Sequence, residues 1–327
     1  MGGRALSESQ TENLTVLRAH APDIEGIRRE VLDGLRKPEK SLPSKLFYDE
    51  RGSELFEEIS ELDEYYLTRT ETAIFIDRID EIASRVGSGV ILIEFGSGNS
   101  QKTRILLDHI LDPAGYVAID ISQEKLTDSA AAIAAAYPGL NVLPIWADYT
   151  HDFDLPALEG SRTVAFFPGS TIGNFHPHEA EAFLRRVAEL VGEGGGLLIG
   201  VDIKKDARIL NLAYDDARGV TAAFNLNILA HINREFGAGF RLDRFRHQAT
   251  YNEEQGRIEM YLVSLEDQTV SLGETEFSFG RDERVLTEVS YKYTVDEFER
   301  LAVGGGFHVK DVWTDPNQLF SVQYLEV

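Results

Sequence analysis

Apolar residues follow a helical spacing in the first quarter of the chain. Every third or fourth residue from Ile24 to Leu35 is apolar, which predicts an amphipathic helix. The same period returns over residues 72–86 and predicts a second helix there. The aromatic-rich stretch from Lys40 to Glu71 shows little regular pattern after Phe56, and irregular stretches of that length tend to be functional. The first 20 or so residues are polar, and we expect them to be loosely held.

From residue 90 onward the pattern changes to short apolar runs separated by helical periods. The run VILIEF at residues 90–95 is unbroken, as is typical of parallel strands that are buried on both faces. Further strands are predicted at 116–121, 141–146, 163–167 and 196–201, and helices at 102–110, 123–136 and 178–191. This alternation of strands and helices predicts a doubly wound α/β domain.

The pattern changes again near Lys204. Residues 206–236 are predicted to be largely helical, and three longer segments follow at 240–251, 257–266 and 284–294. Polar and apolar residues alternate along these segments, which favours an antiparallel sheet with one solvent-facing side. A helix at 295–303 and strands at 307–313 and 320–325 then resume the α/β pattern, and the last two strands are predicted to form a closing hairpin.

These changes of pattern predict two domains, each built from two separate segments. Residues 71–203 and 293–327 are predicted to form the doubly wound α/β domain, with a terminal antiparallel strand. Residues 204–292 interrupt that domain as an α+β insert, and residues 1–70 are their predicted partner.

Composition excludes several kinds of protein. The 327 residues include 32 Lys and Arg against 55 Asp and Glu, a formal net charge of −23. Such a charge repels phosphate backbones, so we expect no nucleic-acid partner. The absence of cysteine removes disulfides, cysteine nucleophiles and thiolate metal sites, and suits a cytoplasmic protein. No apolar stretch approaches the roughly 20 residues that a membrane span needs.

Histidines raise the question of a metal site. His176 and His178 stand two residues apart beside a predicted helix start, and His151 lies upstream. The chain has neither a cysteine nor an H-E-x-x-H pattern, so we expect no metal.

Polar or glycine-rich residues follow four of the predicted parallel strands. Glu94 and the turn Gly96-Ser97-Gly98 end the first strand, Asp120 ends the second, and Asp148-Tyr149 follow the third. A fourth, glycine-rich end spans residues 168–174. Open α/β sheets bind ligands at the carboxyl ends of their strands, and a carboxylate about 20 residues after the glycine turn holds a ribose. The four ends together predict a nucleoside site.

The same residues favour one nucleoside over another. A dinucleotide site has a third glycine, where this chain has Ser100 or Gln101. Glu94 would sit badly beside a pyrophosphate but would suit the cationic end of S-adenosylmethionine. The closing strand hairpin also fits an S-adenosylmethionine-dependent methyltransferase. A nicotinamide dehydrogenase is therefore disfavoured.

The chain resembles the histidine Nα-methyltransferases of ergothioneine biosynthesis. The resemblance extends over nearly the whole chain, and its blocks are more specific than the glycine turn and strand-end acids shared by methyltransferases in general. It implies trimethylation of the α-amine of L-histidine by S-adenosylmethionine, giving hercynine, and a substrate pocket formed by the insert and the N-terminal segment. The matching blocks are SLPSKLFYDERGSELFEEI, DEYYLTRTE, EFGSGNSQKTR, FFPGSTIGNF, AYDDARGVTAAFN, RIEMYL and VLTEVS.

The resemblance also implies a role for individual residues. For the substrate it implies that Tyr65 and Asn174 meet the amine, Asn174 and Tyr214 hold the carboxylate, Glu288 and Ser290 hold the imidazole, and Phe56 and Met260 form apolar walls. Tyr65 and Asn174 are thereby the expected catalytic residues. For the cofactor it implies contacts with Tyr48, Gly96, Lys102, Asp120, Asp148 and Tyr149.

Elementary chemistry agrees with the assignment of the imidazole. Glu288 and Ser290 are two residues apart on a predicted strand, so their side chains point to the same face. A neutral imidazole has one donor and one acceptor nitrogen, which a carboxylate and a hydroxyl can serve. Two alternatives stay open at this point, an N-methyltransferase for a tryptophan-type amino acid and a catalytically silent binding protein. The sequence does not fix the oligomeric state, and a monomer is the working expectation.

Overall fold

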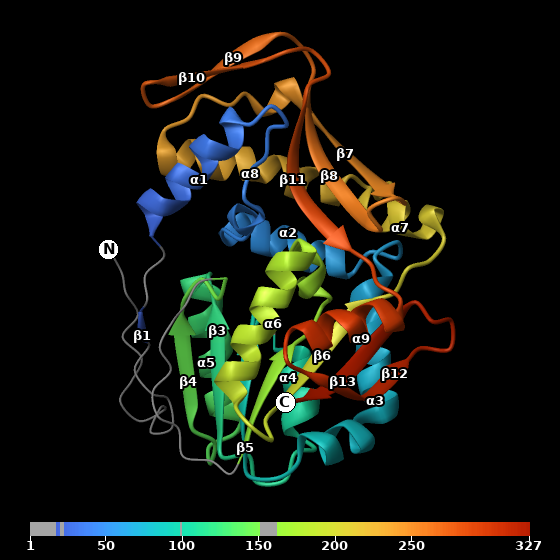
Figure 1. Cartoon of the computed structure of the whole chain (residues 1–327). Helices are drawn as coiled ribbons and strands as arrows, with labels where there is room; N and C mark the ends of the chain where they lie inside the picture. Colours follow the sequence, from blue (N-terminus) through green and yellow to red (C-terminus); the bar gives the residue numbers. More distant parts are fainter. Residues whose placement is uncertain (1–17, 20–22, 99, 151–161) are drawn as a thin grey trace.

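The computed structural model describes residues 18–19, 23–98, 100–150 and 162–327, and a mixed eight-stranded sheet forms its base (Figure 1). The strand order is β1–β4–β3–β2–β5–β6–β13–β12. Neighbours from β1 to β6 pair in parallel, whereas β13 pairs antiparallel with both β6 and β12. The predicted doubly wound sheet with a terminal antiparallel strand is thus confirmed. The strands are β1 (Arg18–Ala19), β2 (Val90–Phe95), β3 (Gly115–Asp120), β4 (Val142–Trp146), β5 (Arg162–Phe167), β6 (Gly196–Asp202), β12 (His308–Thr314) and β13 (Phe320–Glu326).

Helices cover both faces of this sheet. On one face lie α3 (Tyr66–Val86), α4 (Gln101–Leu107) and α5 (Gln123–Ala136), and on the other lie α6 (Pro177–Val191) and α9 (Val295–Gly304). Two consecutive residues of β5 show why the strand is apolar throughout. Phe166 packs on Phe75 of α3, with ring centroids 5.6 Å apart, and Phe167 packs on Phe183 of α6 at 4.8 Å. Successive strand residues point to opposite faces, so a strand covered on both sides needs apolar residues at every position.

A second group of elements lies above the carboxyl ends of the parallel strands (Figure 1). Its antiparallel sheet has the order β11–β8–β7, with helix α8 packed between this sheet and α2. These elements confirm the predicted α+β character of the insert. They are α1 (Ile24–Arg36), α2 (Glu50–Ser60), α7 (Ala207–Tyr214), α8 (Val220–Phe236), β7 (Phe245–Asn252), β8 (Arg257–Ser264) and β11 (Arg284–Tyr291).

One interpretation of local structure was wrong, and one pair of strands was missed. The stretch from Lys40 to Glu71 is mostly helical, with a 3₁₀ turn η1 (Ser44–Phe47), then α2, then the start of α3. Helix α2 buries Leu55 and Ile59, which are four residues apart, and its acidic neighbours mask that period in the sequence. The hairpin of β9 (Gln268–Leu272) and β10 (Thr275–Phe279) was not predicted, because its two strands are short.

Only some of the predicted domain boundaries lie between helices and strands of the structure. The boundary after residue 70 lies inside α3, whereas the boundaries after residues 203 and 292 lie just beyond β6 and β11. The division into two domains therefore stays a prediction. The expectation of a loosely held N-terminus falls mostly on residues outside the described ranges.

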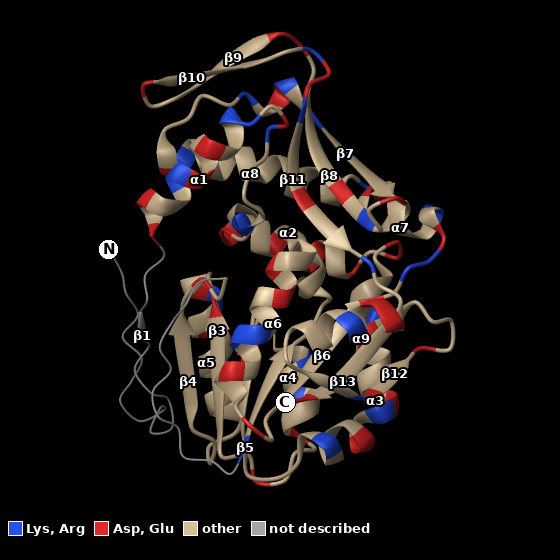
Figure 2. Ribbon diagram, in the orientation of Figure 1, with Lys and Arg blue, Asp and Glu red and all other residues tan. Residues whose placement is uncertain are grey.

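Charged residues are distributed over the whole fold. Figure 2 shows acidic and basic positions interspersed along helices such as α1 and α3 rather than gathered in one segment. In the part of the chain that the structure describes, no helix is both long and apolar enough to cross a membrane. The expected cytoplasmic location and the monomeric state stay predictions.

Candidate active site

A cavity of about 710 Å³ opens at the carboxyl ends of the parallel strands β2 to β5. Its volume lies in the range of roughly 300–1,000 Å³ that is usual for small-molecule sites. The structure brings all the residues that were expected at the cofactor into the lining of this one cavity. They are Tyr48, Gly96, Lys102, Asp120, Asp148 and Tyr149.

The glycine turn after β2 gives the cavity an open backbone wall. Gly96 and Gly98 have φ angles of 76° and 43°, which side chains other than glycine rarely adopt. A Cβ atom at Gly96 would meet nothing within 4 Å, so backbone conformation rather than crowding requires this glycine. Ser100 also has a positive φ, 55°, immediately before α4. The turn thus leaves its main chain accessible to a ligand.

Two strand-end carboxylates line the cavity with different partners. Burial raises the pKa of Asp120, whose Oδ1 accepts from the backbone N–H of Ser122 at 2.9 Å. Burial acts in the same direction on Asp148, but hydrogen bonds from Thr150 and the charge of Lys45 outweigh it and hold the pKa of Asp148 below its ordinary value. Sequence reasoning missed Lys45, whose ammonium lies 2.9 Å from Asp148.

A buried glutamate that sequence reasoning missed holds Lys102 in the cavity wall. Glu71 is fully buried in α3 and forms an ion pair with Lys102. The same carboxylate accepts from the backbone N–H of Gly169, at 3.0 Å. Glu71 therefore links the cavity residue Lys102 to the loop after β5. A buried acid within a helix was the available signal, but sequence alone does not show burial.

Glu94 has partners within the protein itself. Its carboxylate accepts from the hydroxyls of Thr103, at 2.7 and 2.8 Å, and Tyr116. Burial raises its pKa to about 7. The sequence interpretation assigned this carboxylate to the cationic end of the cofactor, whereas in the structure it also fastens β2 to α4 and β3.

A smaller cavity of about 50 Å³ adjoins the large one. All the residues that were expected to bind the amino-acid substrate line it. They are Phe56, Tyr65, Asn174, Tyr214, Met260, Glu288 and Ser290. Phe56, Tyr65 and Asn174 line both cavities, so their side chains form a common wall between the two.

The strand pairing explains how three of these residues meet. Glu288 of β11 pairs with Met260 of β8, and a bulge interrupts the register between Leu286 and Glu288. The hydroxyl of Thr287 stabilises this bulge, because its single proton lies between Oδ1 of Asn225, at 2.7 Å, and the carbonyl of Met260, at 3.1 Å. Glu288 and Ser290 both line the small cavity, as predicted from their spacing.

A glycine lets the loop after β5 approach β11 closely. The 3₁₀ turn η2 (Thr171–Asn174) lies against this strand. A Cβ atom at Gly173 would come within 2.6 Å of the carbonyl oxygen of Tyr291, closer than real Cβ contacts allow. Gly173 therefore permits Asn174 to lie beside β11, the strand that bears Glu288 and Ser290.

Aromatic rings enclose the common wall. The ring of Tyr65 lies edge-on to Phe56, at 6.2 Å, and to Tyr214, at 6.1 Å. Phe224, which sequence reasoning missed, completes this group through contacts with Phe56 and Tyr48 at 6.1 Å. Burial raises the pKa of Tyr65 and of Tyr214 well above the ordinary value, so both hydroxyls are neutral near pH 7. They can act as hydrogen-bond partners rather than as charged groups.

Burial also shapes the chemistry of Glu288. It raises the pKa of this carboxyl to about 7, and the nearby ammonium of Lys292 acts in the opposite direction. The residues described offer the carboxyl no hydrogen-bond donor. A ligand with an N–H group would supply the missing donor.

The expected absence of a metal stays a prediction. Among the described residues, no group of three or more His, Asp or Glu side chains is arranged to hold a metal ion. His176 and His178 stack with ring centroids 6.1 Å apart, and His176 lies 3.3 Å from the hydroxyl of Tyr291. His151 lies outside the described residues.

Comparison with known proteins identifies the family to which the chain and its two cavities belong. Residues 27–327 match the family model described as histidine-specific methyltransferase, SAM-dependent. The chain belongs to this family. It is therefore an S-adenosylmethionine-dependent methyltransferase of the histidine-specific type, which confirms the resemblance drawn from its sequence blocks and contradicts the dehydrogenase and the silent binding protein.

Individual relatives cover most of the chain. It is 42% identical to histidine N-alpha-methyltransferase of Mycolicibacterium smegmatis, over 89% of this chain and 92% of that one. The protein of the same name from Mycobacterium tuberculosis is 41% identical, over 88% and 91% of the two chains. Ergothioneine biosynthesis protein 1 of Neurospora crassa is 32% identical over 95% of this chain, which corresponds to 36% of that longer protein.

Proposed function

We propose that this enzyme transfers three methyl groups from S-adenosylmethionine to the α-amine of L-histidine and so produces hercynine for ergothioneine biosynthesis. The observation that supports the proposal best is the pair of adjoining cavities. The residues expected at the cofactor line the larger one, those expected at histidine line the smaller one, and Tyr65 and Asn174 line both. The names of the similar proteins agree with it.

The residues of the large cavity fit S-adenosylmethionine. The glycine turn offers accessible backbone, Asp120 offers a carboxylate for a ribose, and Asp148 and Tyr149 offer an acceptor and a ring for the adenine. When bound, S-adenosylmethionine supplies an electrophilic methyl group on a sulfonium centre. The leaving thioether is neutral, so the site needs no strong general acid.

The small cavity would hold histidine by its three polar groups. Glu288 accepts from one imidazole nitrogen and Ser290 serves the other. Asn174 and Tyr214 hold the carboxylate, and Phe56 and Met260 enclose the apolar part of the substrate. A site with buried polar groups rejects ligands that cannot pair with them, often by large factors.

Tyr65 and Asn174 would orient the amine at the common wall. The amine nitrogen must be neutral to react, and a neutral tyrosine hydroxyl can accept an N–H of the amine and so direct its lone pair toward the methyl group. Positioning of this kind and the exclusion of water contribute a large share of the barrier reduction in such reactions. The rings around Tyr65 give each added methyl group an apolar surface to contact.

Mass spectrometry of the product tests the proposal. Purified enzyme is incubated with S-adenosylmethionine and either L-histidine or L-tryptophan. A histidine product heavier by three methylene units, with fragments that place them on the α-nitrogen, is the expected result. A product that stops at one or two methyl groups would contradict trimethylation. Methylation of tryptophan but not histidine would replace the proposed substrate by an indole amino acid and would contradict the roles given to Glu288 and Ser290.

A further inference from the structure

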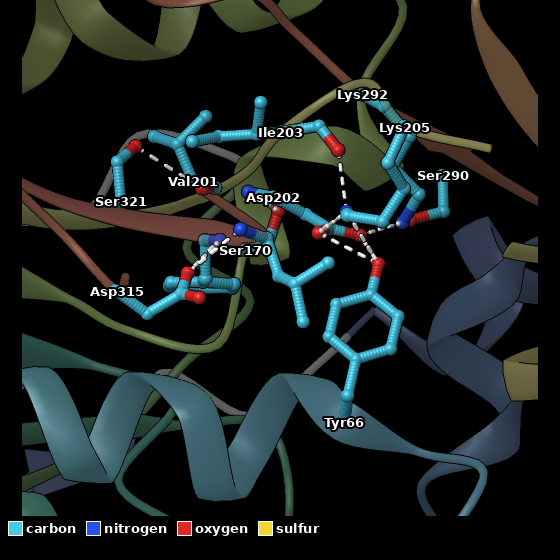
Figure 3. Close-up of polar contacts among 12 residues, drawn as sticks. Tyr66, Ser170, Val201, Asp202, Ile203, Lys205, Ser290, Lys292, Asp315 and Ser321 are labelled. Atoms are coloured by element: carbon cyan, nitrogen blue, oxygen red, sulfur yellow. Dashed lines mark hydrogen bonds and ion pairs between the residues drawn. The ribbon is translucent and has the colours of Figure 1, made fainter. Parts of the chain in front are cut away.

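Behind the small cavity lies a buried cluster of charges that the proposed mechanism does not use (Figure 3). Lys292 follows β11 directly, and its side chain is fully buried. Its ammonium lies 2.8 Å from Asp202, at the end of β6. Asp202 also pairs with Lys205 and accepts a hydrogen bond from Tyr66. Neither Lys292 nor Asp202 lines either cavity, so this cluster lies behind the substrate-facing residues.

Lys292 connects this cluster to two residues of the substrate cavity. It donates to the hydroxyl of Tyr214 at 2.9 Å and to Oγ of Ser290 at 2.8 Å. With the contact to Asp202, these bonds use all three donors of the ammonium group. An ammonium cannot accept a hydrogen bond, so each hydroxyl must present a lone pair to Lys292.

This arrangement determines what the two hydroxyls can offer a ligand. Each has a single proton, and they lie 2.9 Å apart, so in the absence of ligand one donates to the other. Lys292 prevents either proton from turning toward the cluster, because its own protons already point at both oxygens. A ligand that accepts hydrogen bonds at both places can draw both protons into the cavity.

The proposed substrate has acceptors of this kind. Its carboxylate only accepts, and the imidazole nitrogen that does not face Glu288 also only accepts. We infer that Lys292 is a positioning residue that fixes the hydroxyls of Tyr214 and Ser290 as donors toward the carboxylate and the imidazole of the substrate. The inference rests on the proposed function, because it uses the substrate groups that this function assigns.

Charge supports the same role. The ammonium of Lys292 lies behind the hydroxyls of Tyr214 and Ser290, and its positive charge is complementary to a substrate carboxylate. Without Lys292, the hydroxyls of Tyr214 and Ser290 could turn their protons toward Asp202. The cavity would then present lone pairs to a carboxylate, an arrangement that disfavours binding.

Substitution of Lys292 by methionine, which keeps its length without its donors, tests the inference. We expect Lys292→Met to raise the KM for histidine roughly ten-fold to a hundred-fold, with the Kd for S-adenosylhomocysteine changed less than two-fold. Lys205→Met is the matched control, since it removes the other ammonium on Asp202 but contacts neither hydroxyl. It should change the KM for histidine less than three-fold. Equal effects of the two substitutions would overturn the inference.

A second variant covers the case in which Lys292→Met does not fold, as judged by thermal unfolding. Lys292→Gln retains N–H donors without the charge and should show a KM for histidine between those of the wild type and Lys292→Met. If it is the only folded variant, its KM should still exceed that of the wild type, by up to ten-fold. A KM equal to that of the wild type in every folded Lys292 variant would overturn this inference alone. A wild-type enzyme that does not methylate histidine would overturn the proposed function and this inference with it.

Discussion

The two cavities of this enzyme are built in different ways. Apart from Tyr48, the residues expected at the cofactor lie between Gly96 and Tyr149, at the ends of neighbouring strands of one sheet or, for Lys102, in the first turn of α4. Those of the substrate cavity come from six separate places between Phe56 and Ser290, and they meet through the packing of β8, β11, η2, helices α2 and α7 and the start of α3. The first site is largely local in the sequence, whereas the second depends on contacts between distant segments. Substitutions of residues that line only one of the two cavities should therefore separate the two functions.

The largest effect should come from Glu288. Its carboxyl has no hydrogen-bond donor among the described residues, so its main partner should be the imidazole. Glu288→Ala should lower kcat/KM for histidine by roughly a hundred-fold, because loss of a hydrogen bond to a charged group costs about 1.5–3 kcal/mol. Steady-state kinetics measures this loss, and calorimetry with S-adenosylhomocysteine should give an unchanged Kd. An equal loss of cofactor affinity would show that the two cavities are not separable.

Tyr65 tests the common wall. Tyr65→Phe keeps the ring contacts with Phe56 and Tyr214 but removes the hydroxyl that would orient the amine. We expect kcat to fall by about ten-fold to a hundred-fold, because a hydrogen bond to a group that becomes charged in the transition state contributes about 1.5–3 kcal/mol. The Kd for S-adenosylhomocysteine should stay within two-fold.

The neighbouring tyrosine provides the control for this substitution. Tyr66 lines neither cavity, and its hydroxyl donates to the buried Asp202 at 2.8 Å. Tyr66→Phe should therefore reduce kcat much less than Tyr65→Phe. Similar losses of kcat in both variants would mean that the hydroxyl of Tyr65 acts only through the packing around it.

A substitution of Asp120 tests the separation of the two cavities from the cofactor side. Asp120→Asn keeps the size of the side chain and an acceptor for Ser122, but it weakens the acceptor offered to a ribose. We expect the Kd for S-adenosylhomocysteine to rise about ten-fold, in line with the loss of one charged hydrogen bond. The KM for histidine at saturating cofactor should be unchanged. A larger effect on histidine than on cofactor would contradict the assignment of Asp120.

The contrast between the cavities also explains what sequence reasoning could predict. Parallel strands such as β2 can be recognised in the sequence as apolar runs, and their carboxyl ends must lie at one edge of the sheet. Gly96, Asp120 and Asp148 could therefore be predicted from the pattern alone. No such rule brings Met260 beside Glu288, since a bulge sets their register, and these residues were reached only through resemblance. Lys292 and Glu71 were missed because burial of a charged residue depends on the complete packing.

One missed residue, Asp202, could have been found by the same search for acids at strand ends that found Asp120. Asp202 ends β6 in the same manner as Asp120 ends β3, as an acid directly after a buried apolar run. The difference is that Asp202 faces two lysines and Tyr66 rather than a cavity. A strand-end acid therefore indicates a polar site, but it does not tell a ligand from an internal partner.

The smallest expected effect concerns stability, and it separates binding from folding at Glu288. Burial raises the pKa of Glu288 to about 7 in the folded chain, above the ordinary value of 4.5. The folded state therefore binds this proton more tightly than the unfolded state does, and the stabilisation is complete below pH 4.5 and is lost as the pH rises through 7. Glu288→Gln removes the ionisation, so it should raise the Tm of the ligand-free enzyme at pH 8 by roughly 2 °C, with little change at pH 5.

Thermal unfolding with and without histidine distinguishes the two roles of this carboxyl. Glu193→Gln, at an exposed glutamate in the turn after α6, serves as the control and should not alter the Tm at either pH. Saturating histidine should raise the Tm of the wild type more than that of Glu288→Gln, because binding stabilises a protein according to ligand affinity. Burial of Glu288 should lower the stability of the ligand-free enzyme in exchange for substrate binding. A lower Tm for ligand-free Glu288→Gln at pH 8 would contradict this, because it would mean that Glu288 stabilises the fold.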